Sequence, residues 1–168
     1  MEIRVRKAIP QDVIGICQMC TRAWWATYTD LYSHAYIEHR IAALFSLERV
    51  RQGISESEGW NGWWVAEAAG KIIGAGGGGL IASGVGEIHV LYVDPERRSE
   101  GIGTRLLQAI SDELNLQGAH EQWVWVAKGN SKGIPFYEAR GFVVREEQSY
   151  QWEVTGEQIT SLRLWRRV

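Results

Sequence analysis

Hydrophobic and polar residues alternate along this chain with two different periods, which predict both strands and helices. Apolar positions two apart predict a strand at 2–7, and apolar positions three and four apart predict a helix that begins near Pro10. The remaining patterns predict a helix at 33–52, strands at 63–67, 71–81 and 86–93, a helix at 101–116, a strand at 123–127, a helix at 131–140, and strands at 142–154 and 158–165. This order predicts one mixed α+β domain over 1–168, with helices on the faces of a central sheet.

Two of the predicted helices carry features that matter for the rest of the chain. The helix at 101–116 has an apolar stripe made of Ile102, Leu106, Leu107, Ile110 and Leu114. The helix at 131–140 is followed by Gly141, a usual stop signal. It also contains Pro135, which lacks a backbone N–H and therefore predicts a kink.

The turn between the strand at 86–93 and the helix at 101–116 contains Gly101 and Gly103. Glycine has no Cβ, so the backbone can adopt positive φ and approach a ligand closely. The free N–H groups of the first helical turn, together with the helix dipole, favour an anion such as a pyrophosphate. Taken alone, the same two glycines fit a tight turn without any ligand.

The sequence around this turn resembles a known family. Arg98-x-x-Gly101-x-Gly103 resembles the acetyl-CoA-binding signature of the GNAT superfamily of N-acetyltransferases, and the segment from Asn130 to Phe142 is similar to a second pattern of that family. The resemblance is strongest over 63–142. It implies the GNAT-type acyl-CoA N-acyltransferase fold, whose twisted central sheet is mostly antiparallel with helices on both faces, and it implies acetyl-CoA as co-substrate.

The resemblance also implies roles for individual residues. Backbone groups of Leu91 and Val93, on either side of Tyr92, pair with the pantetheine arm, and the Val93 amide faces the thioester oxygen. Asn130 contacts the pantetheine, and Tyr137 protonates the departing thiolate. Phe136 is interpreted as a packing aromatic within this cofactor-binding segment. The pyrophosphate is held by the backbone amides of Arg98, Ser99, Glu100, Gly101, Ile102, Gly103 and Thr104.

Acetyl transfer to an amine also needs a group that accepts the proton of the amine. Glu87 and His89 lie two apart on the predicted strand at 86–93, so their side chains share a face. Glu87 is preferred because many relatives carry a carboxylate near this point, whereas His89 has the more suitable intrinsic pKa. The choice between them stays open, and either residue also fits an ordinary polar surface.

The acceptor site is expected at the aromatic segment 24–32, where the family usually builds it. Trp24, Tyr28 and Tyr32 are candidates to line it, and Asp30 or Glu38 would attract a cation. Core packing explains the same aromatic residues equally well.

Two other patterns are interpreted without a site. The glycine run at 74–79 contains a G-x-G-x-x-G pattern, but no helix is predicted after it, so it indicates a strand with little side-chain bulk. Cys17 and Cys20 lie on the apolar stripe of a predicted helix and indicate core thiols. No cysteine lies near the proposed chemistry, which favours direct attack by the amine over an acetyl-cysteine intermediate.

Composition removes several classes of function. The 168 residues carry a net charge of −2, so no broad basic surface indicates nucleic acid binding. No apolar run is long enough to span a membrane, and no metal site is expected. With no targeting segment and only two Cys, a cytoplasmic location is expected.

The sequence therefore predicts an acetyl-CoA-dependent N-acetyltransferase that acts on a primary amine of a small molecule or peptide. One alternative is a non-catalytic acyl-CoA-binding or sensing module of the same fold, and another is an unrelated α+β interaction protein. Many relatives form homodimers, but these residues leave the oligomeric state open.

Overall fold

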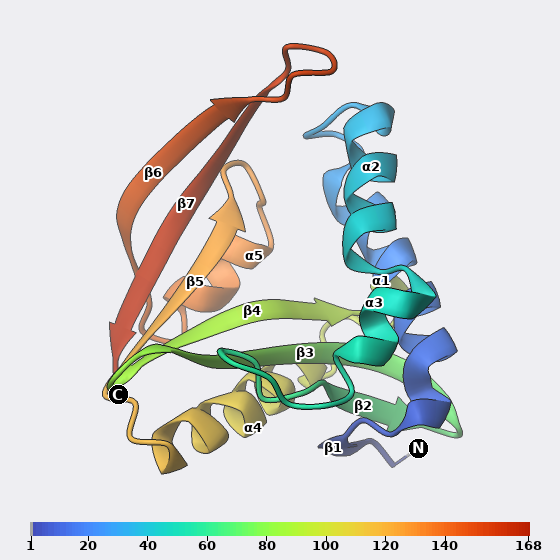
Figure 1. Ribbon diagram of the computed structural model, residues 1–168, viewed down its shortest axis with the longest axis vertical. Coiled ribbons are helices and arrows are strands. Elements are labelled where there is room, and N and C mark those ends of the chain that lie inside the picture. Colours follow the sequence, from blue (N-terminus) through green and yellow to red (C-terminus); the bar gives the residue numbers. More distant parts are fainter. Residues whose placement is uncertain (1) are drawn as a thin grey trace.

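A computed structural model describes residues 2–168 (Figure 1). The seven strands form one sheet in the order β1-β2-β3-β4-β5-β7-β6, in which only the β4–β5 pair is parallel. The predicted mixed α+β fold with a mostly antiparallel sheet is confirmed.

The strands are β1 (Arg4–Lys7), β2 (Trp64–Ala68), β3 (Lys71–Ala82), β4 (Val85–Val93), β5 (Glu121–Ala127), β6 (Val143–Gln151) and β7 (Gln158–Arg167). The helices are α1 (Val13–Tyr28), α2 (His34–Leu44), α3 (Leu47–Gln52), α4 (Ile102–Leu116) and α5 (Gly133–Glu138). Short 3-10 turns lie at Pro10–Asp12 and Pro95–Arg97.

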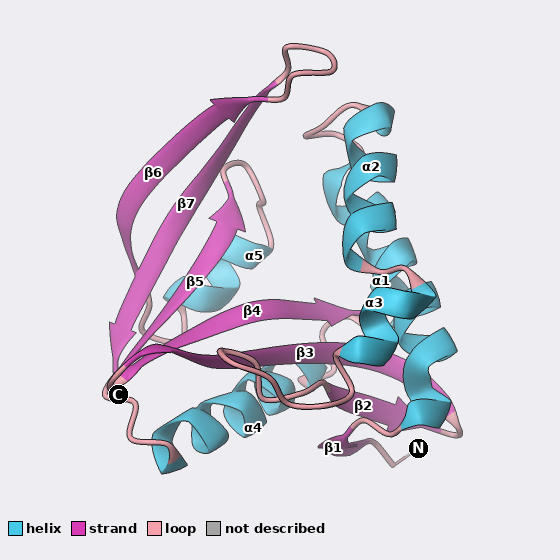
Figure 2. Ribbon diagram, viewed as in Figure 1, coloured by secondary structure: helices cyan, strands magenta, loops and turns pink. Residues whose placement is uncertain are grey.

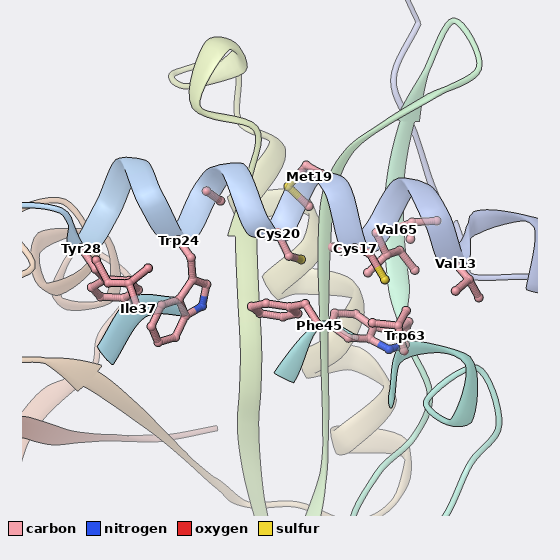
Figure 3. Close-up of a cluster of buried hydrophobic side chains, with 14 of the residues drawn as sticks. Val13, Cys17, Met19, Cys20, Trp24, Tyr28, Ile37, Phe45, Trp63 and Val65 are labelled. Carbon is pink, nitrogen blue, oxygen red and sulfur yellow. The ribbon is translucent and has the colours of Figure 1, made fainter. Parts of the chain in front are cut away.

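Helices cover both faces of the sheet, as Figure 2 shows. On one face, α1 buries a stripe that contains Cys17 and Cys20 against β3, so the prediction of core thiols is confirmed (Figure 3). On the other face, α4 buries all five residues of its predicted apolar stripe. Within residues 2–168, none of the helices combines the length and apolarity that crossing a bilayer requires.

The single helix predicted for 33–52 is instead two helices, α2 and α3. The break falls at Phe45 and Ser46, and the Ser46 hydroxyl accepts a hydrogen bond from the Arg49 N–H at 3.1 Å. A serine that caps a new helix competes with continuation of the old one. Both helices pack against the same core, so apolar residues recur at helical spacing across the break. The sequence pattern therefore gave no sign of the boundary between α2 and α3.

The kink predicted at Pro135 is wrong. Helix α5 begins at Gly133, so Pro135 lies in its first turn, where the N–H would have no intrahelical partner. The Ala139 N–H donates to the Pro135 carbonyl at 2.9 Å, which closes the helix normally. The predicted start of this helix was two residues too early, which placed the proline in the wrong turn.

The glycine run is confirmed as a strand with little side-chain bulk. The indole of Trp60 lies so close to Gly77 that an added Cβ would meet a ring carbon at 2.3 Å, and an added Cβ at Gly79 would meet the Gly59 carbonyl oxygen at 2.2 Å. On the opposite face, Gly74 lets α4 approach closely. These glycines therefore bring a loop and a helix against the two faces of β3.

The parallel pair β4–β5 opens the sheet at its centre. Its register runs from Val85–Glu121 only as far as Ile88–Val124, after which the two strands diverge. At this point β4 carries one extra residue, because Gly77 pairs with Val90 while Gly78 pairs with Ile88. A bulge of this kind bends a strand, and here it starts the fork between β4 and β5. Beyond the fork, one edge of β4 has no strand beside it.

Candidate active site

A cleft of about 770 Å³ fills the fork between β4 and β5. Its lining comes from the end of α1, the second half of β4, the turn before α4, the tip of β5 and the helix α5. Most predicted site residues line it, including His89, Leu91, Val93, Gly101, Gly103 and Tyr137. The predicted residues that lie outside the lining are Glu87, Glu100, Trp24 and Tyr32. The fork thus gathers residues that are separated by more than a hundred positions in the sequence.

The free edge of β4 supplies backbone groups to this cleft. The Asp94 N–H donates to the Ile73 carbonyl at 2.8 Å, so this residue faces β3. In an antiparallel ladder, alternate residues face the partner strand and the residues between them face the opposite way. Val93 and Leu91 therefore direct their N–H and C=O groups away from β3, into the fork. Tyr92 instead pairs its backbone with β3, opposite Ala75.

The turn before α4 forms a cradle of unpaired N–H groups. Gly101 precedes the helix with φ of 78°, in the left-handed region that glycine adopts without strain. For residues 2–168, the N–H groups of 101–104 have no hydrogen-bond acceptor within the protein. These four donors converge at the positive end of the α4 dipole, which is the arrangement that binds phosphate groups. We call the N–H groups of 101–104 the cradle.

Positive side chains surround the cradle. Four cations line the cleft, namely Arg97, Arg98, Lys132 and Arg140, and of these Arg97 forms an ion pair with Glu100 at 2.7 Å. Arg140 donates to the Thr104 hydroxyl, and its guanidinium lies 3.9 Å from the centre of the Phe136 ring. Arg140 was not predicted as a site residue. Its place directly before Gly141-Phe142, at the end of the second family pattern, was the only signal in the sequence.

Phe136 and Gly103 hold α5 against the start of α4. An added Cβ at Gly103 would lie 3.2 Å from the Phe136 ring, so the glycine permits the close approach of the two helices. Phe136 packs at an edge-to-face angle against Tyr137. The prediction that Phe136 packs within the cofactor-binding segment agrees with this position.

Tyr137 is buried beside the fork, with 7% of its surface exposed. Burial raises the pKa of this phenol well above its ordinary value, and the nearby Tyr28 acts in the same direction. The group is therefore a neutral O–H donor at physiological pH. Its hydroxyl forms no hydrogen bond with any other of residues 2–168, so it is free to donate to a ligand in the cleft.

Asn130 both lines the cleft and starts α5. Its side-chain oxygen accepts hydrogen bonds from the N–H groups of Gly133 at 2.8 Å and Lys132 at 3.3 Å. An asparagine whose side-chain oxygen accepts from N–H groups two and three residues further on fixes the turn that leads into a helix. Through these two hydrogen bonds Asn130 positions α5, the helix that carries Tyr137.

Glu87 and His89 form one charged cluster with Arg163 at the point where the fork begins. Glu87 accepts from Arg163 at 2.8 Å and is paired with the His89 Nδ1 at 2.9 Å, while the other ring nitrogen of His89 lies 2.9 Å from the Gly59 carbonyl. Both ring nitrogens thus face acceptors, which only the protonated imidazole satisfies. Of the two candidate bases, His89 lines the cleft and Glu87 lies behind it.

The contact between Glu87 and His89 raises the pKa of the histidine and lowers the pKa of the carboxyl. The hydrogen bond to Glu87 raises the pKa of His89 above its ordinary value, against burial, which lowers it. Burial raises the pKa of the Glu87 carboxyl, but the hydrogen bonds from His89 and Arg163 outweigh it, and the net pKa is lowered. Arg163, which anchors Glu87, was not predicted, because its pairing depends on the register of β5 with β7.

The predicted acceptor aromatics occupy three different environments. Trp24 is 6% exposed and packs against Phe45 in the core between α1 and the sheet (Figure 3). Tyr28 lines the cleft and shares a hydrogen bond of 2.9 Å with the Tyr92 hydroxyl. Tyr32 stacks on Tyr28 at 5.3 Å and is half-buried. Asp30 also lines the cleft, whereas Glu38 is exposed on α2.

A cradle for phosphates, an unpaired strand edge and a buried phenol meet in this one fork, and their residues fit an acyl thioester that carries a diphosphate. The class of protein that this fold and cleft define is the acyl-CoA N-acyltransferase. Among residues 2–168, no group of three or more His, Cys, Asp or Glu side chains is placed to hold a metal ion.

Comparisons with known proteins agree. The model of the acetyltransferase (GNAT) family matches residues 18–142. The chain is 30% identical over 148 residues to the spermidine N(1)-acetyltransferase of Thermoplasma acidophilum, covering 87% of this chain and 91% of that protein. It is 38% identical over 52 residues to the ribosomal protein bS18 alanine N-acetyltransferase of Escherichia coli, covering 31% of this chain and 35% of that protein.

A solved structure is similar over the full length. The PaiA N-acetyltransferase of Thermoplasma acidophilum in complex with coenzyme A has a TM-score of 0.87 and 26% sequence identity, and the match covers 100% of both chains. This chain therefore belongs to the acetyltransferase (GNAT) family. It transfers an acetyl group from acetyl-CoA, its co-substrate, to an amine.

Proposed function

We propose that this protein acetylates the primary amine of a small, linear molecule by direct attack on acetyl-CoA bound in the fork. The observation that carries the catalytic part is the meeting of the cradle, the Val93 edge and the free Tyr137 hydroxyl in one cleft. A non-catalytic sensor of acyl-CoA would need the cradle but would have no use for a buried phenol that donates into the cleft.

The small acceptor is supported by the extent of the similarities. The relative named for spermidine aligns along 87% of this chain, whereas the relative named for a ribosomal protein aligns along 31%. A panel of amines assayed for release of the free CoA thiol tests this assignment. Spermidine and other linear amines should give the highest kcat/KM, and a peptide with a free amino terminus that outperforms all of them would contradict it.

The backbone of β4 and the Tyr137 hydroxyl act on opposite sides of the bond that breaks. The Val93 N–H donates to the thioester oxygen, where negative charge develops as the amine nitrogen attacks the carbonyl carbon. As the carbon–sulfur bond breaks, the Tyr137 O–H donates its proton to the sulfur. Because the phenol is held neutral by burial, the proton is present when it is needed.

The Glu87–His89 pair receives the proton that the amine loses. A lysine-like amine is almost fully protonated near neutral pH, with a pKa of about 10.4, so a base beside the cleft accelerates the reaction. His89 faces the cleft and Glu87 holds it in place. His89 accepts the proton in its neutral form, through a water, after its second ring nitrogen has released the Gly59 carbonyl, and Glu87 sets the pH at which the neutral form appears.

The pH dependence of kcat/KM tests this pair. Only unprotonated His89 accepts a proton, so kcat/KM should rise with pH through a midpoint above the ordinary histidine pKa of about 6.5. In Glu87→Gln the anion that raises the pKa of His89 is gone, so the midpoint should move to lower pH. An unchanged midpoint in Glu87→Gln, or the same rise in His89→Gln, would remove the pair from the mechanism.

A further inference from the structure

Trp125 of β5 lines the cleft but takes no part in the proposed chemistry. It is 39% exposed, although tryptophan is a large apolar side chain. Its neighbours Val124 and Val126 are buried in the same cluster as Tyr137. Because successive residues of a strand point to opposite faces of the sheet, Trp125 lies on the face away from that cluster. The two faces of β5 therefore contribute to different parts of the cleft.

The register of the sheet places Trp125 on the same face as His89. Trp123 pairs with Glu87 of β4, and Trp125 pairs with Arg163 of β7. Arg163 donates to Glu87 at 2.8 Å, and Glu87 in turn is paired with His89 at 2.9 Å, so all these side chains share one face. Trp125 comes directly after the last residue of β5 that pairs with β4, where Figure 1 shows the two strands diverging. Trp125 and His89 therefore lie on opposite sides of the fork, where the amine is proposed to lose its proton.

The Arg163 guanidinium holds the Trp125 ring in place. It lies 4.8 Å from the centre of the Trp125 ring and 4.8 Å from the centre of the Trp123 ring. The Arg163 side chain is only 15% exposed, and its charge is paired with Glu87. One face of the Trp125 ring is thus covered by an ion pair without net charge, and the exposed part of the ring is left to the cleft. A ring fixed in this way loses little freedom when a ligand binds to it.

A fixed, exposed indole beside a carboxylate favours a cationic ligand. The face of an aromatic ring attracts an ammonium group, and tryptophan does so more strongly than tyrosine or phenylalanine. The carboxylate is that of Asp30, which lines the same cleft. Asp30 directly precedes Leu31, and a methyl of Leu31 lies against Gly129 in the loop after β5. Both the ring and the carboxylate therefore lie toward the tip of β5, and both attract positive charge.

We infer that Trp125 is a specificity-determining residue that binds a second ammonium group of the acceptor, so that the preferred substrates are amines with at least two positive charges. This inference rests on the proposed function. The reacting amine must be neutral when it attacks, beside His89, whereas the second ammonium keeps its charge and lies on the indole ring. A monoamine of the same chain length lacks this contact, and the protein therefore discriminates against it.

The test compares Trp125→Leu, which removes the ring, with Trp125→Phe, which keeps a smaller one. Trp123→Leu is the matched control, because the Trp123 ring lies at the same distance from Arg163 but is not part of the cleft lining. The two acceptors are 1,4-diaminobutane and 1-aminobutane, which share the carbon chain and the reacting amine and differ in the second ammonium group. Kinetics of CoA release are measured for each protein with each acceptor.

The native protein should prefer the diamine. In Trp125→Leu, the ratio of kcat/KM for the diamine to kcat/KM for the monoamine should fall about tenfold, mainly through the KM of the diamine. Trp125→Phe should lose less of this ratio, and Trp123→Leu should keep the native ratio. An unchanged ratio in Trp125→Leu, an equal fall in Trp123→Leu, or native protein without a preference for the diamine would overturn the inference.

A binding measurement separates this inference from the catalytic proposal. With CoA bound, the Kd for spermidine, measured by titration calorimetry, should rise about tenfold in Trp125→Leu and stay at the native value in Trp123→Leu. Binding that depends on Trp125 without any turnover would support the inference and contradict the proposed function. Turnover of linear amines with equal Kd values in the two variants would overturn the inference and leave the proposed function intact.

Discussion

Replacement of Tyr137 by phenylalanine is expected to lower kcat about 10²–10³-fold, with the Kd for acetyl-CoA almost unchanged. The phenol hydroxyl lines the cleft and is the proposed proton donor to the sulfur, so without it the thiolate leaves unprotonated. The ring itself packs edge-to-face on Phe142 and is retained in the variant. The measurement is the steady-state rate of CoA release with saturating spermidine, beside calorimetric titration of acetyl-CoA.

The thermal midpoint is the control for this variant. The Tyr137 hydroxyl forms no hydrogen bond with the rest of the described chain, so its removal costs the fold little. A variant that melts like the native protein and turns over as fast would show that another group protonates the sulfur. The same result would favour a cleft that binds acyl-CoA without a chemical role for this tyrosine.

Replacement of Gly101 by aspartate should weaken binding of acetyl-CoA about 100-fold. Gly101 has φ of 78°, and nothing lies within 4 Å of an added Cβ, so a short side chain fits in space. Asp and Asn are the residues other than glycine that best tolerate this backbone region. The new carboxylate would face the phosphates across the cradle. Two like charges roughly 5 Å apart at an effective dielectric constant near 20 repel by about 3 kcal/mol, equivalent to about 100-fold in Kd.

Gly101→Asn separates charge from shape in this test. Asparagine has the same number of non-hydrogen side-chain atoms as aspartate and tolerates positive φ equally well, but it carries no charge. Gly101→Asn should therefore raise the Kd for acetyl-CoA only about fivefold or less. Both constants are obtained by titration calorimetry at one fixed ionic strength. Equal Kd values for the two variants would mean that no anionic group of the ligand lies near the start of α4.

The parts of the site that lie close together in sequence could be predicted well. The turn with Gly101 and Gly103 combines a positive-φ residue with a helix start, and both properties follow from residue type. The apolar stripe of α4 follows from its helical period. Strand alternation correctly placed Glu87 and His89 side by side. In each case the chemistry depends on residues a few positions apart.

The parts that depend on distant pairing could not be predicted. The bulge at His89 follows from how β4 meets β3, and it reverses which face of the sheet later residues occupy: Val90 packs with α1, whereas Leu91 packs with α4. Arg163 reaches Glu87 only because β7 pairs with β5. The strand period gives no register between strands, so these contacts have no local signal.

The acceptor aromatics illustrate the same limit within a helix. Trp24 and Tyr28 are four apart and share one face of α1, yet only Tyr28 lines the cleft. Helical spacing predicts a common face but not where the core ends and the cleft begins. That boundary is set by Phe45, from the break between α2 and α3, which covers Trp24.

We propose that the amides of 101–104 are the donors that bind the diphosphate of acetyl-CoA. Hydrogen exchange at these four amides, followed by NMR with and without CoA, tests it most directly, and pantetheine without phosphates serves as the comparison ligand. CoA should slow exchange at all four positions, and pantetheine should leave them unchanged. Equal exchange rates with and without saturating CoA would contradict the account, because a donor that holds a phosphate is protected from solvent.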